Sequence, residues 1–453
     1  PADAAEAAGL LSYSGWARDS VWLLALSQKG LLGNTINLLW EPLEDIDPAA
    51  VTTREEAAAL FQVGQPERVV LTFNATHGLN IAVHSLVKPG ATVLLSGYEH
   101  NAVTRPLASI ADVRLRVVRA PLFCPNLFLE ELERRLTPEV DVVICTHVSN
   151  VFGCVQPLEE IAGVCRSRGV PLLVDNAHGA YLNFLVGGSR HPIALGAAMC
   201  CDSGHKTLPV LTGGAYLHLG PKAPVQEETA VRNALALFGS TSPSYLILQS
   251  LDRCNRYLSE GYPLRLYSCC GQLTRMRRVL NEQAAAAGCP LPLAVDDPAR
   301  EPLKLTLDAA VLGMTGTALA EALRQDRIEC EYADPRYVVL MFTPENPAQD
   351  YERLEAAVAR LCAALPSAPV LPEPEADVFT ELAAEAASVC TVRQAVFAPQ
   401  EVVPAETALG RICAMPTVSC PPAIPIVVSG ERIGPAALKL FARYGIKNVA
   451  VLK

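Results

Sequence analysis

The 453-residue chain lacks several patterns that define well-known classes of protein. Lysine and arginine total 37 against 47 acidic residues, so the basic excess of nucleic-acid and anionic-membrane binders is missing. No apolar run reaches about 18 residues, so we expect no membrane-spanning helix. The first residues show no basic segment before an apolar run, so we expect no signal peptide and a cytoplasmic location.

Fifteen cysteines are present, yet none are spaced as Cys-x-x-Cys. This spacing argues against zinc ribbons and thioredoxin-type redox sites and favours reduced thiols in the cytosol. All eight histidines lie between residues 77 and 218, but no His-x-His or His-Glu-x-x-His spacing supports a metal site. We therefore expect no metal centre.

What the sequence does contain is an alternation of apolar strands and amphipathic helices from residue 68 onward. Strands are predicted at 68–73, 92–95, 115–118, 141–145, 171–175 and 214–219, and helices at 78–88, 127–136 and 158–168. Continuous apolar strands separated by helices indicate a mostly parallel sheet covered on both faces. The predicted fold class is therefore α/β.

The pattern changes after about residue 255, where a long helical stretch precedes a smaller alternating unit. A proline-rich linker at 366–374 separates this unit from a last αβ segment. We predict an N-terminal segment (1–45), a large α/β domain (46–255), a small α/β domain (256–365) and a C-terminal domain (375–453).

The strongest local signal for chemistry is Lys206, in the stretch Ser-Gly-His-Lys-Thr-Leu just before an apolar strand. A lone lysine is most often a solvated surface residue. A lysine among small and polar residues before a buried strand also suits a Schiff-base lysine, whose amine must be partly desolvated to act as a nucleophile.

Asp175 adds weight to this interpretation. It ends a predicted buried strand, where a carboxylate is costly unless it meets a cation such as a pyridinium nitrogen. Capping of a helix is the plainer alternative for Asp175. A third feature is the small-residue turn 74–80, which opens a helix and whose free N–H groups, with the Thr76 hydroxyl, could hold a phosphate.

Together these motifs resemble those of pyridoxal-phosphate enzymes with the aspartate-aminotransferase fold (fold type I). Within them the chain resembles the Orn/Lys/Arg decarboxylase family, over roughly residues 46–453. The stretches that carry the resemblance are 175–180, 203–212, 240–245 with 250–252, 410–412, and 421–425 with 430–431. The resemblance implies a homodimeric or larger enzyme that decarboxylates arginine, lysine or ornithine to the amine, a step towards polyamines.

The resemblance also implies a role for each matching residue. Lys206 would bind pyridoxal 5'-phosphate covalently, Asp175 would pair with the pyridine nitrogen, and the ring would lie between His100 and Ala177. Asn150 would contact the ring hydroxyl. The implied phosphate contacts are Thr76, the His77 amide, Ser203, His205 and, across a dimer, Ser240 of the partner subunit.

Two alternatives stay open. Segments 99–107 and 147–151 are similar to cysteine desulfurases and selenocysteine lyases, which need a mobile cysteine loop and an arginine for the substrate carboxylate. The strand 338–342 is wholly apolar where that arginine is expected, with Arg336 the nearest substitute, which favours a decarboxylase. The family's usual Pro-Gly-His-Lys motif near the N-terminus is absent, which leaves a cofactor-binding paralogue without activity as the second alternative.

Overall fold

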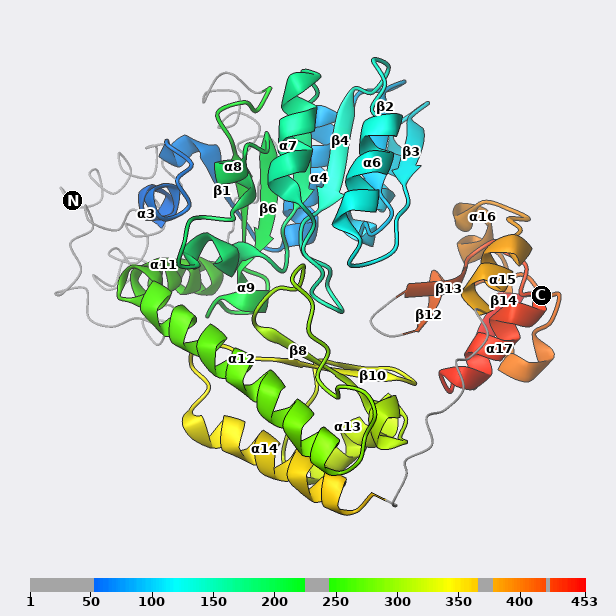
Figure 1. Ribbon diagram of the computed structural model, residues 1–453. Helices are drawn as coiled ribbons and strands as arrows, with labels where there is room; N and C mark the ends of the chain where they lie inside the picture. Colours follow the sequence, from blue (N-terminus) through cyan, green and yellow to red (C-terminus); the bar gives the residue numbers. More distant parts are fainter. Residues whose placement is uncertain (1–52, 225–243, 366–377, 421–423) are drawn as a thin grey trace, which may run out of the picture. The chain divides into compact units, whose positions relative to one another are not determined.

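The computed structural model describes residues 53–224, 244–365, 378–420 and 424–453 (Figure 1). The chain forms two compact units. The first runs to residue 275 and includes 296–304 and 342–346, and the second contains 276–295, 305–341 and 347–453. The division of the chain into four parts, predicted from the sequence, stays a prediction.

A seven-stranded sheet organises the first unit, in the order β1-β7-β6-β5-β4-β2-β3. Only β7 runs antiparallel to its neighbours β1 and β6, and the remaining pairs are parallel. The predicted mostly parallel sheet is therefore confirmed. The strands are β1 (Val69–Thr72), β2 (Thr92–Ser96), β3 (Arg114–Val118), β4 (Val142–Thr146), β5 (Leu172–Asp175), β6 (Met199–Ser203) and β7 (Ala215–Leu219).

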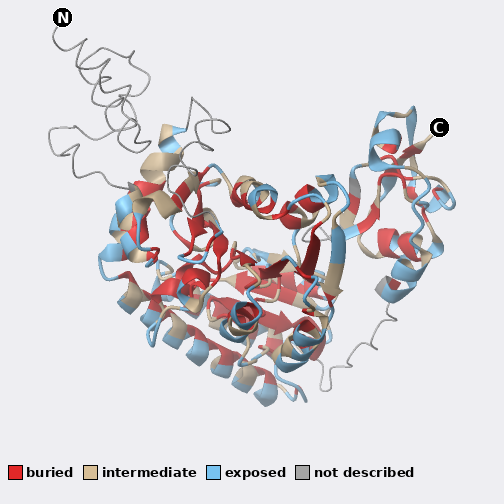
Figure 2. Cartoon of the chain, turned by 90° about the horizontal axis from the view of Figure 1, so that it is seen from above, coloured by how far each residue is buried: buried red, intermediate tan, exposed pale blue. Residues whose placement is uncertain are grey.

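Helices cover both faces of this sheet, as alternation of the strand side chains requires. On one face Val93 and Leu95 pack with α4 (Ala75–Leu86) and α5 (Asn101–Ser109). On the other, Leu94 packs with α6 (Pro125–Arg135), α7 (Leu158–Ser167) and α8 (Pro192–Leu195). Figure 2 shows the buried residues gathered in these strands and on the inner faces of the helices.

Further helices of the first unit lie before, between and after these strands. They are α3 (Thr53–Leu60), α9 (Gly204–Thr207), α11 (Tyr245–Ser259) and α12 (Tyr262–Ala286), the last of which continues into the second unit. Local signals explain the helix ends. The Asn74 side chain caps α4 by accepting the His77 N–H, and Gly90, at φ 80°, makes the turn that follows.

The second unit contains a three-stranded sheet and a C-terminal segment. The sheet has the order β8 (Lys304–Asp308), β10 (Tyr337–Met341), β9 (Tyr332–Ala333), with helices α13 (Gly316–Gln325) and α14 (Ala348–Ala363). The C-terminal segment comprises α15 (Val378–Glu385), α16 (Val392–Phe397), β11 (Gln400–Pro404), β12 (Thr417–Cys420), β13 (Ile424–Val428), α17 (Pro435–Arg443) and β14 (Asn448–Leu452). It has a hydrophobic core of its own, which includes Leu440 and Val449.

Two histidines of the first unit lie in different surroundings. His84 is on the exposed face of α4. His191 comes just before the first residue of α8, outside helix and strand, and is fully buried.

Candidate active site

The carboxyl ends of five strands gather the predicted site residues at one edge of the sheet. β2, β4, β5 and β6 are parallel, and β1 runs in their direction because β1 and β6 are each antiparallel to β7. Within a few residues of these strand ends come, in chain order, Thr76, His77, His100, Asn150, Asp175, Ala177, Ser203, His205 and Lys206. This edge is where open α/β sheets bind ligands. Ser240, the remaining predicted residue, lies outside the described residues.

Lys206 lies on α9, the short helix that follows β6. Its Nζ is 3.1 Å from Nε2 of His178, and the Lys206 side chain is half-buried. Sequence analysis did not assign His178 to the site, although it stands in the same motif as Asp175 and Ala177. The contact between the two side chains makes His178 the direct neighbour of the candidate nucleophile.

Asp175 ends β5 and is only 4 % exposed. Its Oδ1 accepts the N–H of Ala177 at 3.0 Å. Burial raises the pKa of this carboxyl, while the same N–H and the positive charges of Lys206 and His100 oppose that rise. A buried carboxylate that faces cations is suited to hold a protonated ring nitrogen.

His100 caps the first turn of α5, and its Nδ1 accepts the N–H of Ala102 at 3.1 Å. The residue keeps a large exposed surface, yet partial burial of the ring lowers its pKa. Asp175 opposes this shift and Lys206 adds to it. The Nδ1 contact holds the imidazole at this edge of the sheet. Stacking of His100 on the cofactor ring stays a prediction.

Glu99, next to His100, holds this loop to β4. Its carboxylate accepts the Thr146 N–H at 2.7 Å and the Thr146 hydroxyl at 3.1 Å, and it also accepts the Ser96 hydroxyl. Burial raises the pKa of Glu99 to about 7, with the hydrogen bonds opposing. Sequence analysis missed this residue because nothing in the local pattern shows which strand end a lone glutamate will reach.

The predicted phosphate residues of the 74–80 turn lie in the first turn of α4. Thr76 is exposed, and the His77 N–H donates to Oδ1 of Asn74 at 2.8 Å, so a phosphate would have to share or displace that bond. The His77 ring stacks on Phe73, and its Nδ1 is buried without a hydrogen-bond partner in the structure. An orphaned polar atom beside a helix N-terminus is compatible with a bound anion.

The other two described phosphate candidates contact one another. Ser203 Oγ lies 3.3 Å from Nδ1 of His205, and the Gly213 N–H donates to the same nitrogen at 3.2 Å. Because Nδ1 accepts from Gly213, a neutral His205 carries its proton on Nε2. Partial burial lowers the pKa of His205, and Lys206 adds to this effect.

A second buried lysine reaches the site from β8. Lys304 is 1 % exposed, and its Nζ donates to the backbone oxygens of Ser149 and Asn150, each at 3.1 Å. The same Nζ lies 3.5 Å from Nδ1 of His178. Asn150 therefore contributes a carbonyl here, while its exposed side chain keeps the predicted ring-hydroxyl role as a prediction. The sequence marks Lys304 only as a charge at the start of an apolar strand.

A buried polar network lies behind Asp175. Asp202 on β6 accepts Nε2 contacts from His191 at 2.9 Å and from His218 at 3.0 Å. Asn176 donates to Asp202 at 2.6 Å, and its own oxygen contacts Nδ1 of His147 at 2.7 Å. Burial alone would raise the pKa of Asp202, but the two histidines hold it below its usual value.

Together these residues fit pyridoxal 5'-phosphate. Asp175 offers a buried carboxylate for the ring nitrogen, Lys206 an amine for covalent attachment, and the start of α4 an orphaned nitrogen for the phosphate. Glycine is required at position 179, in the same motif as Asp175, because a Cβ there would lie 2.1 Å from Asn176 Oδ1. The donor set therefore agrees with the cofactor that the sequence motifs imply.

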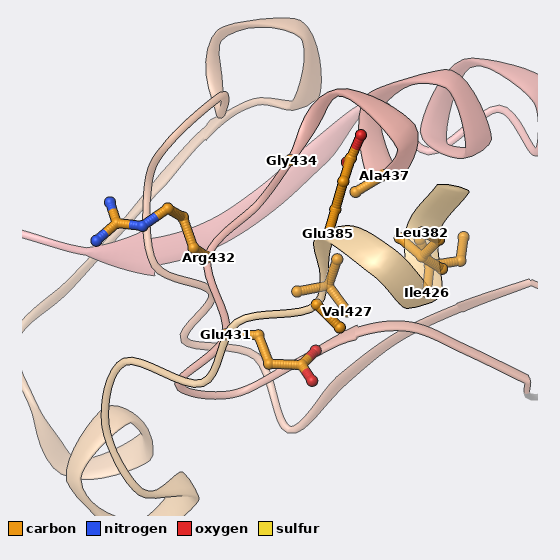
Figure 3. Close-up of a pocket in the computed structure, with 9 residues that line it drawn as sticks. Leu382, Glu385, Ile426, Val427, Glu431, Arg432, Gly434 and Ala437 are labelled. Carbon is orange, nitrogen blue, oxygen red and sulfur yellow. The ribbon is translucent and has the colours of Figure 1, made fainter. Parts of the chain in front are cut away.

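A hollow in the C-terminal segment is a different feature. It is lined by residues of α15, β13 and α17, among them Glu385, Ile426 and Ala437 (Figure 3). Glu385 occupies one side and accepts the N–H of Ala436 at the start of α17, at 2.9 Å. None of the predicted cofactor residues lines this hollow.

Comparisons with known proteins relate the whole chain to enzymes of one fold. The aminotransferase class-V family model matches residues 29–208. An arginine decarboxylase of Bacillus subtilis is 26% identical over 421 residues, covering 90% of this chain and 84% of the relative. A probable cysteine desulfurase of Xylella fastidiosa is 32% identical, but over 37% of this chain and 42% of the relative. The structure of the constitutive lysine decarboxylase of Escherichia coli superposes with a TM-score of 0.64 at 15% identity, covering 97% of this chain and 78% of that chain.

The chain thus has the fold of the type I pyridoxal-phosphate enzymes. The resemblance to the Orn/Lys/Arg decarboxylase family is confirmed, and the chain is related to the decarboxylases of this fold. In the part of the chain that the structure describes, no helix is both long and apolar enough to cross a membrane.

Proposed function

We propose that the protein decarboxylates a basic amino acid (arginine, lysine or ornithine) to the corresponding amine, with pyridoxal 5'-phosphate bound to Lys206. The observation that carries the proposal is the arrangement of Lys206 against His178 beside the buried Asp175. The match to an arginine decarboxylase over 90% of the chain supports the same reaction class.

The cofactor, when bound, supplies an electron sink for the bond that breaks at Cα. Asp175 keeps the ring nitrogen protonated, because a buried carboxylate is stabilised by a cation at contact distance. His178 contacts the Lys206 amine, and His100 lies at the same edge of the sheet. Exclusion of water around the substrate carboxylate would favour its loss as neutral carbon dioxide.

Two observations count against the desulfurase alternative. The guanidinium of Arg336 forms an ion pair with Asp308, with Nη2 and Oδ2 2.7 Å apart, so it is already engaged. Every cysteine whose side chain the structure describes is buried or half-buried. Burial raises the pKa of Cys145, Cys200 and Cys201 well above the usual value, which opposes formation of a nucleophilic thiolate.

We further propose that the enzyme is cytoplasmic, serves polyamine synthesis and works as a homodimer or larger homo-oligomer with shared sites. The resemblance implies that Ser240 of the partner subunit would contact the phosphate. Mixing inactive Lys206→Ala protein with an inactive Ser240 variant should restore part of the activity through hybrid dimers. A catalytically competent monomer in analytical ultracentrifugation would contradict shared sites.

One incubation series tests the reaction. The purified protein is supplied with pyridoxal 5'-phosphate and, separately, with arginine, lysine, ornithine and cysteine, while carbon dioxide, amine and sulfide are measured together. Carbon dioxide and the matching amine from one basic amino acid are expected. Sulfide from cysteine without carbon dioxide would replace the proposal with a desulfurase, and silence from all four would favour the inactive paralogue.

A further inference from the structure

The His178 ring lies between two lysines. Its Nε2 is 3.1 Å from Nζ of Lys206, and its Nδ1 is 3.5 Å from Nζ of Lys304. A neutral imidazole has one N–H and one lone pair, so it can donate to one lysine and accept from the other. With a neutral ring, the lysine that accepts the ring N–H must be a neutral amine, whereas the lysine that donates to the ring lone pair can be an ammonium.

The surroundings keep the ring neutral. Burial lowers the pKa of His178 well below its usual value, and the positive charge of Lys304 lowers it further, as does that of Lys206 whenever that amine is protonated. An imidazolium between two lysines would bring three like charges together in a buried place. The tautomer of His178 therefore decides which of the two lysines must be a neutral amine.

The ammonium form is better supported at Lys304. Its Nζ donates to two backbone carbonyls, those of Ser149 and Asn150, and carbonyl oxygens stabilise a cation. Gly153, at φ 66°, leaves room for this lysine, since a Cβ there would lie 3.2 Å from Cδ of Lys304. The third N–H of the ammonium can then be donated to Nδ1 of His178.

We propose that Lys304 is a positioning residue for the cofactor lysine. By donating to Nδ1 it places the ring proton of His178 on Nε2, and that N–H is donated to Lys206, which stays a free amine. The inference rests on the proposed role of Lys206. A free amine is needed there because its lone pair forms the C–N bond with an aldehyde, with loss of water.

Other charged groups act on the same amine. The Asp175 carboxylate favours an ammonium at Lys206, whereas His100 and His205, when protonated, disfavour it. Lys304 acts on Lys206 through contact with His178, while Asp175 acts through its charge. These influences together set the protonation of Lys206. We assign the largest effect to the contacts that lead from Lys304 through His178 to Lys206.

The test reads the protonation of Lys206 in cofactor-free full-length protein. Trace labelling with acetic anhydride across pH 6–11, followed by mass spectrometry of the Lys206 peptide, gives the pH midpoint at which this amine becomes reactive. We expect Lys304→Met to raise the midpoint by about one pH unit and to lower labelling at pH 7 about tenfold. Lys88→Met, which removes an exposed lysine charge, should leave the midpoint unchanged.

His178→Gln supplies the second variant, and it also serves if Lys304→Met fails to fold. We expect His178→Gln alone to raise the midpoint, and Lys304→Met to add nothing in that background. Lys304→Arg should restore part of the wild-type midpoint because it keeps the charge. An unmoved midpoint in the single variants, or a full extra shift in the double variant, would overturn the inference. Labelling needs no cofactor, so its result is separate from failure of the proposed reaction.

Discussion

Lys206 and His178 are in direct contact, with 3.1 Å between Nζ and Nε2. The two residues stand 28 positions apart, at the ends of neighbouring parallel strands. This contact lies at the edge of the sheet where we propose that the reaction takes place. Asp175, at the same edge, is the first residue to change by mutation.

Asp175→Asn should keep the fold and part of the bound cofactor but lower kcat about 100-fold or more. A neutral amide cannot hold the pyridine nitrogen protonated, so stabilisation of the developing charge is lost. The measurements are kcat, cofactor absorbance and thermal melting by circular dichroism. Asp141→Asn is the matched control, because Asp141 also accepts a backbone N–H, that of Thr92 at 2.8 Å. Near-normal kcat in Asp175→Asn would refute the assigned role.

Asp202→Asn should lower the free energy of unfolding by about 3 kcal/mol, because it leaves two buried histidines without their shared carboxylate. Denaturant titration followed by circular dichroism measures the change. Glu139→Gln, which removes an exposed partner of Arg116, should cost about 1 kcal/mol or less. Equal losses in the two variants would show that the network behind Asp175 contributes nothing special.

Glu99→Gln should remove a pH dependence of stability. Burial raises the folded pKa to about 7 from its ordinary value of 4.5, so the folded protein binds more protons than the unfolded chain between these values. The stabilisation is present below about pH 4.5 and is lost as pH rises through 7. Although Glu99 keeps part of its surface exposed, we expect the wild type to lose about 2 kcal/mol across this window relative to the variant.

Denaturant midpoints at pH 5, 6, 7 and 8 measure this difference. Glu130→Gln, on the exposed face of α6, is the control and should give a curve parallel to that of the wild type. Parallel curves for Glu99→Gln and the wild type would show that the Glu99 carboxyl does not titrate in this range.

Much of the first unit could be predicted from the sequence, because buried parallel strands are continuous apolar runs. The strands at β1 to β5 fall within two residues of the predicted ranges. β6 was not predicted, since an aspartate and a serine leave only a short apolar run in Met199–Ser203. Asp202 is buried there because His191 and His218 pair with it, a compensation that arises only in the folded chain.

Prediction of the candidate site from the sequence is limited in the same way. Motifs located Lys206 and Asp175, since each stands in a distinctive stretch at a strand end. Lys304 and Glu99 could not be located, because their partners are 126 and 47 residues away along the chain. Side chains brought together only by the sheet order leave no local pattern in the sequence.

The central claim is that Lys206 holds the cofactor. The most direct measurement is borohydride reduction of the protein loaded with pyridoxal 5'-phosphate, followed by peptide mass spectrometry. The account predicts a yellow protein and a phosphopyridoxyl mass fixed on the peptide that contains Lys206. The label on any other lysine, Lys304 included, would contradict it.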